Sequence, residues 1–378
     1  MSGRPLIVLS CIVTNSSVLH VKIRSRPATQ QLSLVSKTQL LLFYRILVLS
    51  RLVMLILSET EVKALIDIDE LIGALKRAHV QYSTGKAVMP VRLVVPLPQI
   101  SGRITSMPGF LQSDKALGIK VVTYFGNNTK QNLPAILATI MLFSAETGKM
   151  IAAIDGSYIT AIRTACASAM ATCALANPET PVLGILGAGV QAEAHIETLC
   201  RVRKLDKIKI YSPSGTSAAR VKDKFESRVS VPIEVGRSAE EAVRGADLVV
   251  TVTTSKEPVL RADWLKPGVH VNAVGSHRPE VREIDGATLA RSTVVVDSRE
   301  AVMAECGDIL LALKENSVTE NHIQTEIGEV LAGSRAGRSS TKEVTLYKSV
   351  GIAIQDVATA HLVYQKALEQ KIGTRVDT

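Results

Sequence analysis

Aromatic side chains are scarce in this chain: Phe, Trp and Tyr make up 3% of its 378 residues. Proteins that bind single-stranded nucleic acid stack bases on aromatic rings, so a surface of that kind is not expected. The formal net charge of +9 would favour a polyanionic partner. However, residues 1–53 hold seven Lys and Arg and no acid, which leaves only +2 for residues 54–378. We therefore expect no nucleic-acid partner.

Closely spaced cysteine pairs are also lacking. The five cysteines are an odd number, and no two of them form the C-x-x-C spacing that zinc sites and redox motifs use. Free, buried thiols in a reducing compartment fit this pattern. We therefore expect a cytoplasmic protein without a metal site.

Long uncharged apolar runs are missing too. Residues 40–57 are apolar, but Arg45 and Arg51 interrupt them, so this stretch holds no run of about 18 uncharged apolar residues, the length that a membrane span needs. Residues 1–53 resemble an organelle transit peptide in composition. The simplest interpretation is an N-terminal extension outside the fold, either a misassigned start or a dispensable leader.

The folded part is predicted to begin at Met54. Ser58 and Glu61 form the pattern of a helix capping box, and a helical region to Thr84 follows. Short segments with strand character come next and predict a sheet with local, antiparallel connections. These segments are residues 92–97, 103–107, 118–125, 138–144 and 151–155.

A second pattern follows an Ala-rich helix predicted over residues 158–176. Apolar strands and helices alternate from Val182 onwards, which predicts a βαβ series and a parallel sheet. Residues 346–368 are predicted to be helical. The expected strands are 182–186, 207–211, 247–253, 270–274 and 293–297, and the expected helices between them include 191–199 and 216–228.

The first of these strands runs into the pattern G-x-G-x-x-A. Gly187 permits a tight turn, Gly189 lets a pyrophosphate approach the backbone, and Ala192 lets the next helix pack closely on the sheet. The helix N-terminus then offers amides and a positive dipole end to phosphates. A turn that uses glycine for geometry alone is the alternative, but we predict a dinucleotide site. Its cofactor-binding residues are Gly187, Ala188, Gly189, Val190 and Gln191.

No acid follows the next strand, where Asp or Glu would bind a ribose 2′-hydroxyl and favour NAD. Ser212 and Ser214 stand there instead and could donate to a 2′-phosphate. NADP(H) is therefore favoured over NAD(H).

Several separated motifs together resemble the ornithine cyclodeaminase/μ-crystallin family. The main ones are the D-G-x-x-I-T-A-x-R-T-A segment at residues 155–165, the glycine turn at 187–192 and N-A-V-G-S-H-R-P at 272–279. Shorter matches lie at residues 107–108, 117–120 and 348–351. The resemblance covers residues 54–378 in order.

This resemblance implies an α/β fold in which a Rossmann-type, doubly wound domain accompanies an α+β substrate and dimerisation domain formed from both chain ends. The implied boundaries are residues 54–176 with 319–378 for the substrate domain and 177–318 for the Rossmann domain. It further implies a homodimer that acts as an NAD(P)-dependent oxidoreductase on CH–NH or C=N bonds.

The resemblance also assigns site residues. Arg92, Lys120 and Val350 match substrate-binding positions, and a guanidinium with an ammonium suits a carboxylate. Lys120 could also give a proton to the substrate nitrogen if burial lowers its pKa. Arg163 and Thr164 match the start of a helix that grips the cofactor phosphates, with a salt bridge as the alternative for Arg163. The positions implied to line the nicotinamide and ribose are Thr253, Asn272, Val274 and Ser349.

Two positions depart from the cyclodeaminases of the family. His277 stands where those enzymes carry an Asp, and Thr105 stands where they carry a Glu. His277 is either a catalytic general acid or only a cap of its turn, and both readings stay open. Glu305 and Asp308 either face the cleft or merely start a helix.

Without those carboxylates a cationic ornithine side chain is disfavoured. We therefore expect a reductase of a small cyclic or linear imino acid, such as 1-pyrroline-2-carboxylate or a ketimine, with hydride transfer at the α-carbon. The alternatives are ornithine cyclodeamination, alanine dehydrogenation, or a μ-crystallin-like protein that only binds a small ligand.

Overall fold

The computed structural model describes residues 8–12, 20–24, 53–131 and 133–377. The chain divides into two units, Met1–Met54 with Arg375–Thr378 and Leu55–Thr374. In the first unit β1 (Val8–Ile12) pairs antiparallel with β2 (His20–Arg24). Most of the extension predicted over residues 1–53 lies outside the described residues, so its separateness from the fold stays a prediction.

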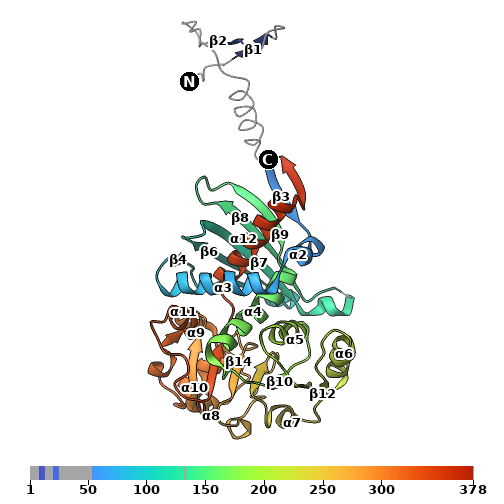
Figure 1. Cartoon of the computed structure of the whole chain (residues 1–378), viewed down its shortest axis with the longest axis vertical. Coiled ribbons are helices and arrows are strands. Elements are labelled where there is room, and N and C mark those ends of the chain that lie inside the picture. Colours follow the sequence, from blue (N-terminus) through green and yellow to red (C-terminus); the bar gives the residue numbers. More distant parts are fainter. Residues whose placement is uncertain (1–7, 13–19, 25–52, 132, 378) are drawn as a thin grey trace. The chain divides into compact units, whose positions relative to one another are not determined.

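The unit Leu55–Thr374 contains a largely antiparallel sheet with the order β3-β9-β8-β7-β6-β4, and β5 pairs with β6 (Figure 1). Helix α12 packs on the middle of this sheet, against β6, β7 and β8. The strands are β3 (Val53–Leu57), β4 (Ala87–Val88), β5 (Leu93–Leu97), β6 (Gly102–Leu111), β7 (Ala116–Phe125), β8 (Ile136–Ser144) and β9 (Met150–Asp155), with β18 (Thr374–Asp377) at the chain end. The helices are α2 (Glu59–Leu65), α3 (Ile68–Ser83) and α12 (Ala353–Gln370).

Alternation along β7 decides which of its side chains turn inward. Gly118 and Lys120 are buried, whereas Ile119 and Val121 between them are partly exposed. Gly118 lies under α12: a Cβ built there would be 3.4 Å from Cγ2 of Val357 and 2.9 Å from Cδ2 of Leu142. The helix therefore approaches the strand closely, and Lys120 is held in the layer between them.

The second sheet is parallel throughout, with the order β12-β11-β10-β13-β14-β17-β15-β16. The order reverses between β10 and β13, which is where doubly wound sheets open a ligand crevice. Its strands are β10 (Val182–Leu186), β11 (Lys207–Tyr211), β12 (Ile233–Val235), β13 (Leu248–Thr251), β14 (His270–Ala273), β15 (Thr293–Val296), β16 (Thr325–Glu326) and β17 (Thr345–Lys348). The helices around it are α4 (Ser157–Leu175), α5 (Val190–Val202), α6 (Thr216–Phe225), α7 (Ala239–Val243), α8 (Gly286–Arg291), α9 (Arg299–Glu305), α10 (Gly307–Lys314) and α11 (Ile327–Leu331).

These two sheets confirm the predicted α/β class with a doubly wound parallel sheet. The domain boundaries expected inside residues 54–378 stay a prediction. One predicted helix was wrong in part. Residues 345–348 form the buried strand β17 rather than the start of a helix, because a short apolar run has no periodicity that separates strand from helix. The helical region predicted from Ser58 to Thr84 is confirmed; it consists of two helices, because Asp67 caps a new helix start.

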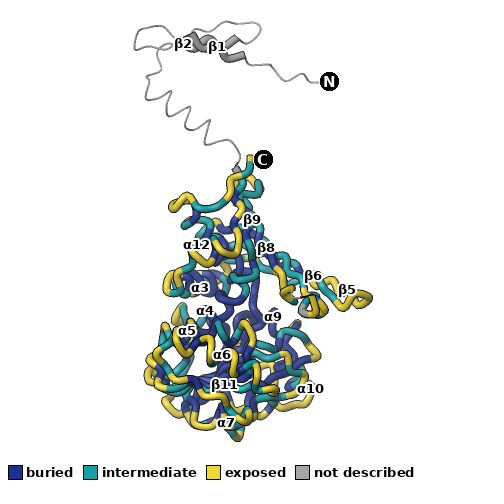
Figure 2. Tube along the Cα trace, turned by 90° about the vertical axis from the view of Figure 1, so that its right-hand side faces the viewer, coloured by how far each residue is buried: buried dark blue, intermediate teal, exposed yellow. Residues whose placement is uncertain are grey.

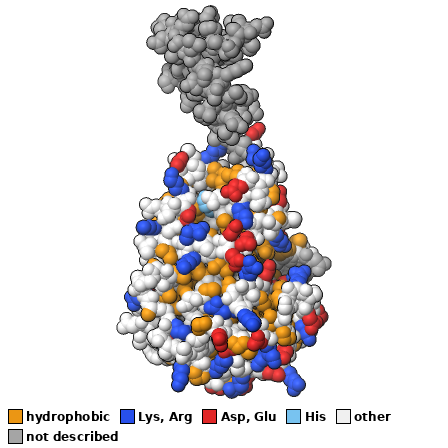
Figure 3. All heavy atoms as spheres, in the orientation of Figure 1, with side chains coloured by type: hydrophobic (Ala, Val, Ile, Leu, Met, Phe, Trp, Pro, Cys, Tyr) orange, Lys and Arg blue, Asp and Glu red, His pale blue; other side chains and the backbone are white. Residues whose placement is uncertain are grey.

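Helix α4 links the two sheets, because it contacts β8 of one and β14 and β17 of the other. Its length and apolar composition would also suit a membrane span, but most of it is buried inside the protein (Figure 2). Lys, Arg, Asp and Glu are interspersed over the face seen in Figure 3, so the described residues on that face form no patch of a single charge.

Candidate active site

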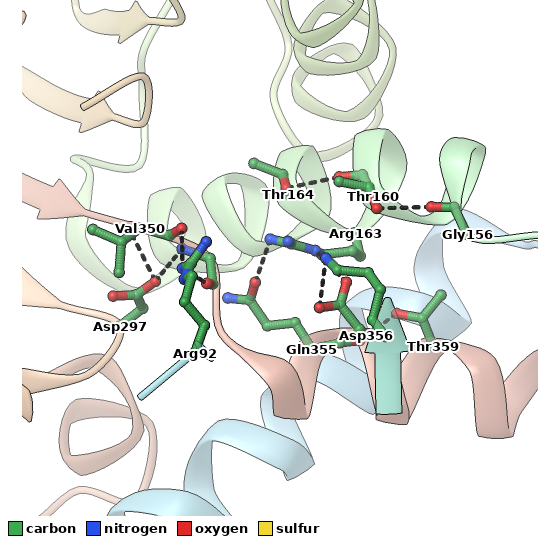
Figure 4. Close-up of polar contacts among 12 residues, drawn as sticks. Arg92, Gly156, Thr160, Arg163, Thr164, Asp297, Val350, Gln355, Asp356 and Thr359 are labelled. Carbon is green, nitrogen blue, oxygen red and sulfur yellow. Dashed lines mark hydrogen bonds and ion pairs between the residues drawn. The ribbon is translucent and has the colours of Figure 1, made fainter. Parts of the chain in front are cut away.

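The best-defined polar cluster in the layer between β7, α4 and α12 is built on Asp356. Its Oδ2 accepts from Nζ of Lys120 at 2.7 Å, and its Oδ1 accepts from Nε of Arg163 at 2.9 Å. Gln355 Oε1 accepts from the same guanidinium at 2.7 Å (Figure 4). Lys120 is 1% exposed, Arg163 4% and Asp356 0%. One carboxylate thus neutralises two buried cations in part, and the cluster carries a net positive charge.

Burial lowers the pKa of Lys120 to about 7. Asp356 opposes this shift, whereas the positive charges of Arg163 and Arg92 add to it. Although burial alone would raise the pKa of the Asp356 carboxyl, Arg163 and Lys120 outweigh it and hold that pKa below its usual range. Lys120 can therefore take up and release a proton near neutral pH while Asp356 stays ionised.

Activity should depend on pH through Lys120. If its ammonium gives a proton to the substrate, kcat is high below pH 7 and falls as pH rises through about 7. Asp356→Asn removes the negative charge that raises this pKa, so the falling limb should move to lower pH. Rate profiles of both proteins check this. Glu146→Gln, which alters only an exposed pair with Lys115, is the control, and a limb unmoved in Asp356→Asn would contradict the assignment.

Arg92 lies in the segment between β4 and β5 and reaches the turn after β17. Its Nη2 donates to the carbonyl oxygens of Val350 and Gly351, at 2.9 and 2.5 Å. Its Nε pairs with Glu305 at 2.8 Å. Among the described residues nothing accepts from Nη1. Arg92, Met107 and Ile352 line a small hollow of about 10 Å³, and the guanidinium is held there by Glu305 and by the two carbonyl oxygens.

The turn after β17 is held from its other side by Asp297. One oxygen of this carboxylate accepts from the backbone amides of Val350 and Gly351 and from the hydroxyl of Ser349, at 2.9, 2.8 and 3.0 Å (Figure 4). The turn that carries Val350 is therefore fixed between Asp297 and Arg92.

The glycine turn has the shape that a pyrophosphate requires. Gly187 has φ +112°, and a Cβ built on it would lie 2.6 Å from the carbonyl oxygen of Val252. A Cβ on Gly189 would meet nothing within 4 Å, so this position is open. No side chain caps the start of α5. The residues present thus fit a dinucleotide, with the first-turn amides of α5 available for its phosphates.

The other predicted residues of this turn are placed consistently with that geometry. Val190 is 68% exposed beside the opening, Ala188 is buried, and the buried Oε1 of Gln191 has no partner among the described residues. After β11, the Ser212 hydroxyl oxygen accepts from the amide of Ala218 and so caps α6 from inside. Ser214 is exposed.

Several predicted residues bond elsewhere in the protein. Arg163 forms a salt bridge with Asp356, which was the alternative to a role at the cofactor phosphates. Thr164 donates to the carbonyl of Thr160 in its own helix at 2.8 Å (Figure 4). The Asn272 amide donates to Thr172 and so faces α4. Their roles toward a cofactor stay predictions. Thr253 and Val274 follow the carboxyl ends of β13 and β14, and the neighbour of Thr253, Val252, contacts Gly187 of the glycine turn.

His277 donates its Nδ1 proton to the carbonyl of Gly275 at 2.9 Å, which leaves the Nε2 lone pair toward Arg103. Burial, with the positive charges of Arg92 and Arg103, lowers the pKa of His277 to about 3. A neutral ring that bonds its own turn favours the capping interpretation over a general acid at neutral pH.

Sequence reasoning missed Asp356, Asp297 and Glu283 and left Glu305 open. Asp297 directly follows a parallel strand, a position where polar residues often serve sites, and so could have been found. Asp356 and Glu283 carry no local signal. Among the described residues no three His, Cys, Asp or Glu side chains are grouped to hold a metal ion.

The fold and this site define an NAD(P)-dependent α/β oxidoreductase. The chain belongs to the ornithine cyclodeaminase/mu-crystallin family, whose model matches residues 52–371. It is 34% identical over 325 residues to a Delta(1)-pyrroline-2-carboxylate reductase of Bacillus cereus, covering 86% of this chain and 100% of the relative. It is 38% identical over 297 residues to the mouse ketimine reductase mu-crystallin, covering 78% and 91%.

Solved structures agree. Thermococcus litoralis Delta(1)-pyrroline-2-carboxylate reductase in complex with NADH and L-proline matches with a TM-score of 0.83 and 39% identity, over 85% of this chain and 100% of that one. An archaeal alanine dehydrogenase dimer with bound NAD matches with a TM-score of 0.81 and 35% identity, over 86% and 99%. The family predicted from the sequence motifs is confirmed.

Proposed function

We propose that this chain reduces a small cyclic or linear imino acid, such as 1-pyrroline-2-carboxylate or a ketimine, with NAD(P)H. The observation that carries the proposal is Lys120, a buried lysine with a pKa of about 7 that is paired with Asp356 near Arg92. The names of the relatives, two of which are reductases of C=N compounds, support the same reaction.

Each residue has a distinct task in this reaction. A bound reduced nicotinamide supplies the hydride to the α-carbon. Arg92 holds the carboxylate through Nη1, while its bonds to Val350 and Gly351 fix the guanidinium. Nζ of Lys120 gives its proton to the imine nitrogen, so that C=N becomes CH–NH. Burial of Lys120 and Asp356 keeps bulk water from this proton.

The two positions at which this chain differs from the cyclodeaminases favour an imino acid over a diamino acid as substrate. Thr105 is buried on β6 and uncharged, and His277 is neutral. Neither offers the negative charge that a second substrate ammonium would need.

The test compares NADPH and NADH oxidation with 1-pyrroline-2-carboxylate, the same oxidation with pyruvate and ammonia, and NAD-dependent loss of ornithine. Rapid turnover in the first assay is expected. Turnover with ornithine alone would overturn the reading of Thr105 and His277, and dinucleotide binding without any turnover would indicate a μ-crystallin-like binding protein.

We further propose that NADP(H) is preferred over NAD(H). Ser214 is exposed at the end of β11 and no carboxylate follows that strand. The same assay gives kcat/KM for both dinucleotides, and a larger value for NADH would contradict the preference. We also propose a cytoplasmic location, because the four cysteines described as free form no disulfide.

We propose a homodimer formed through exposed apolar strand residues. Leu93, Val94 and Val95 of β5 are 65%, 43% and 45% exposed, and Leu137 of β8 is 45% exposed. Several exposed apolar side chains on one sheet indicate a surface that a second copy of the chain could bury. We expect Val94→Glu combined with Leu137→Glu to elute as a monomer in light-scattering chromatography. The control is Val235→Glu on β12, also exposed, which should stay dimeric; dimers from both variants would refute this interface.

A further inference from the structure

Two strand-end segments lie beside the glycine turn, at the switch point where doubly wound sheets bind ligands. Thr253 follows β13 and Gly275 follows β14, and the two strands are parallel neighbours. The segment after β13 touches the glycine turn directly, because a Cβ on Gly187 would lie 2.6 Å from the Val252 carbonyl oxygen. These segments therefore border the glycine turn on the side away from β11, next to the place where a dinucleotide would lie.

One buried carboxylate joins the two segments. Glu283 is 0% exposed; its Oε1 accepts from the Thr253 amide at 2.5 Å and its Oε2 from the Gly275 amide at 2.6 Å. Oε2 also accepts from the Thr251 hydroxyl at 2.7 Å. A Cβ on Gly275 would lie 2.5 Å from Oε1, so glycine is required for this approach.

Glu283 is itself held in place by a second buried carboxylate. Its own amide and that of Ile284 donate to Oδ1 of Asp308, at 2.7 and 3.1 Å. Asp308 in turn pairs with Nζ of Lys348 at 2.9 Å, and both are 0% exposed. The cation of Lys348 offsets two neighbouring carboxylates, so that β17 and α10 hold Glu283 in place.

We propose that Glu283 is a positioning residue that fixes the spacing of the segments after β13 and β14 and thereby shapes the nicotinamide side of the dinucleotide crevice. This role rests on the proposed function. It requires a group with two acceptor oxygens, because each segment presents a backbone N–H. A glutamine keeps one acceptor oxygen, and its NH₂ group cannot accept from the other amide.

The test is Glu283→Gln in the full chain. The Kd for NADPH and for NADH, measured by titration calorimetry, should rise about tenfold because one segment is released. KM for the imino acid should change less than about twofold, since Arg92 and Lys120 are untouched. Thr251→Val is the matched control: it removes the third bond to the same carboxylate but no segment amide, and should leave both Kd values unchanged.

Gly275→Ala provides a second route, because its methyl group must push Glu283 and Thr253 apart. It should also raise the Kd for the dinucleotide. In the variant that combines Glu283→Gln with Gly275→Ala, Kd should rise by less than the product of the two single rises, because both changes release the same contact. Unchanged Kd values in folded Glu283→Gln or Gly275→Ala, or an equal rise in Thr251→Val, would overturn the role of Glu283. A wild-type protein that binds neither dinucleotide would instead overturn the proposed function.

Discussion

Turnover of the imino acid should fall at least about 100-fold when Lys120 is replaced by Met, because a positioned general acid contributes about 10²–10⁴ to a rate. The Kd for NADPH should change little, since Lys120 comes from β7 rather than from the glycine turn. Met has a similar length and no charge, so it fills the same space. Asp356 keeps its bond to Arg163 at 2.9 Å and is not left as an unpaired buried charge.

Single-turnover kinetics with bound NADPH, together with calorimetry for the Kd, separate the two effects. Lys115→Met is the matched control, because Lys115 lies just before the same strand but is exposed and paired only with Glu146. Wild-type rates in Lys120→Met would remove this lysine from the proton transfer. Loss of NADPH binding along with turnover would show that its role is structural.

The features that the sequence predicted are those set by local backbone geometry. The glycine turn follows from Gly187 and Gly189, whose spacing serves one strand and one helix. Lys120 was assigned to the site through the family resemblance, and the alternation of β7 turns its side chain inward.

The partners of these residues could not be predicted, because they come from distant parts of the chain. Asp356 meets Lys120 only once α12 packs on β7, and an acid in the first turn of a helix is ordinarily explained by the helix dipole. Glu283 likewise acquires a meaning only when β13 and β14 become neighbours. Long-range packing thus decides which charges are neutralised, and with it the pKa of the reacting group.

Replacing Gly189 with Val should strongly weaken dinucleotide binding without disturbing the fold. The backbone there has φ −100° and ψ −167°, which any residue adopts, and a Cβ would meet no atom within 4 Å. The added side chain therefore stands in the space that the pyrophosphate needs, next to the first amides of α5. We expect the Kd for NADPH and NADH to rise about 100-fold or more, a loss of about 2.8 kcal/mol, with the melting temperature nearly unchanged.

A glycine elsewhere separates this effect from a general effect of glycine replacement. Gly73 lies within α3, where a Cβ would make an ordinary contact at 3.6 Å with Arg77. Gly73→Ala should leave cofactor affinity unchanged and stabilise the helix by up to about 1 kcal/mol. Retained NADPH affinity in Gly189→Val would mean that the dinucleotide does not cross this turn. The segment at the switch between β10 and β13 would then have to bind a different ligand, because a dinucleotide over a G-x-G-x-x-A turn passes close to the second glycine.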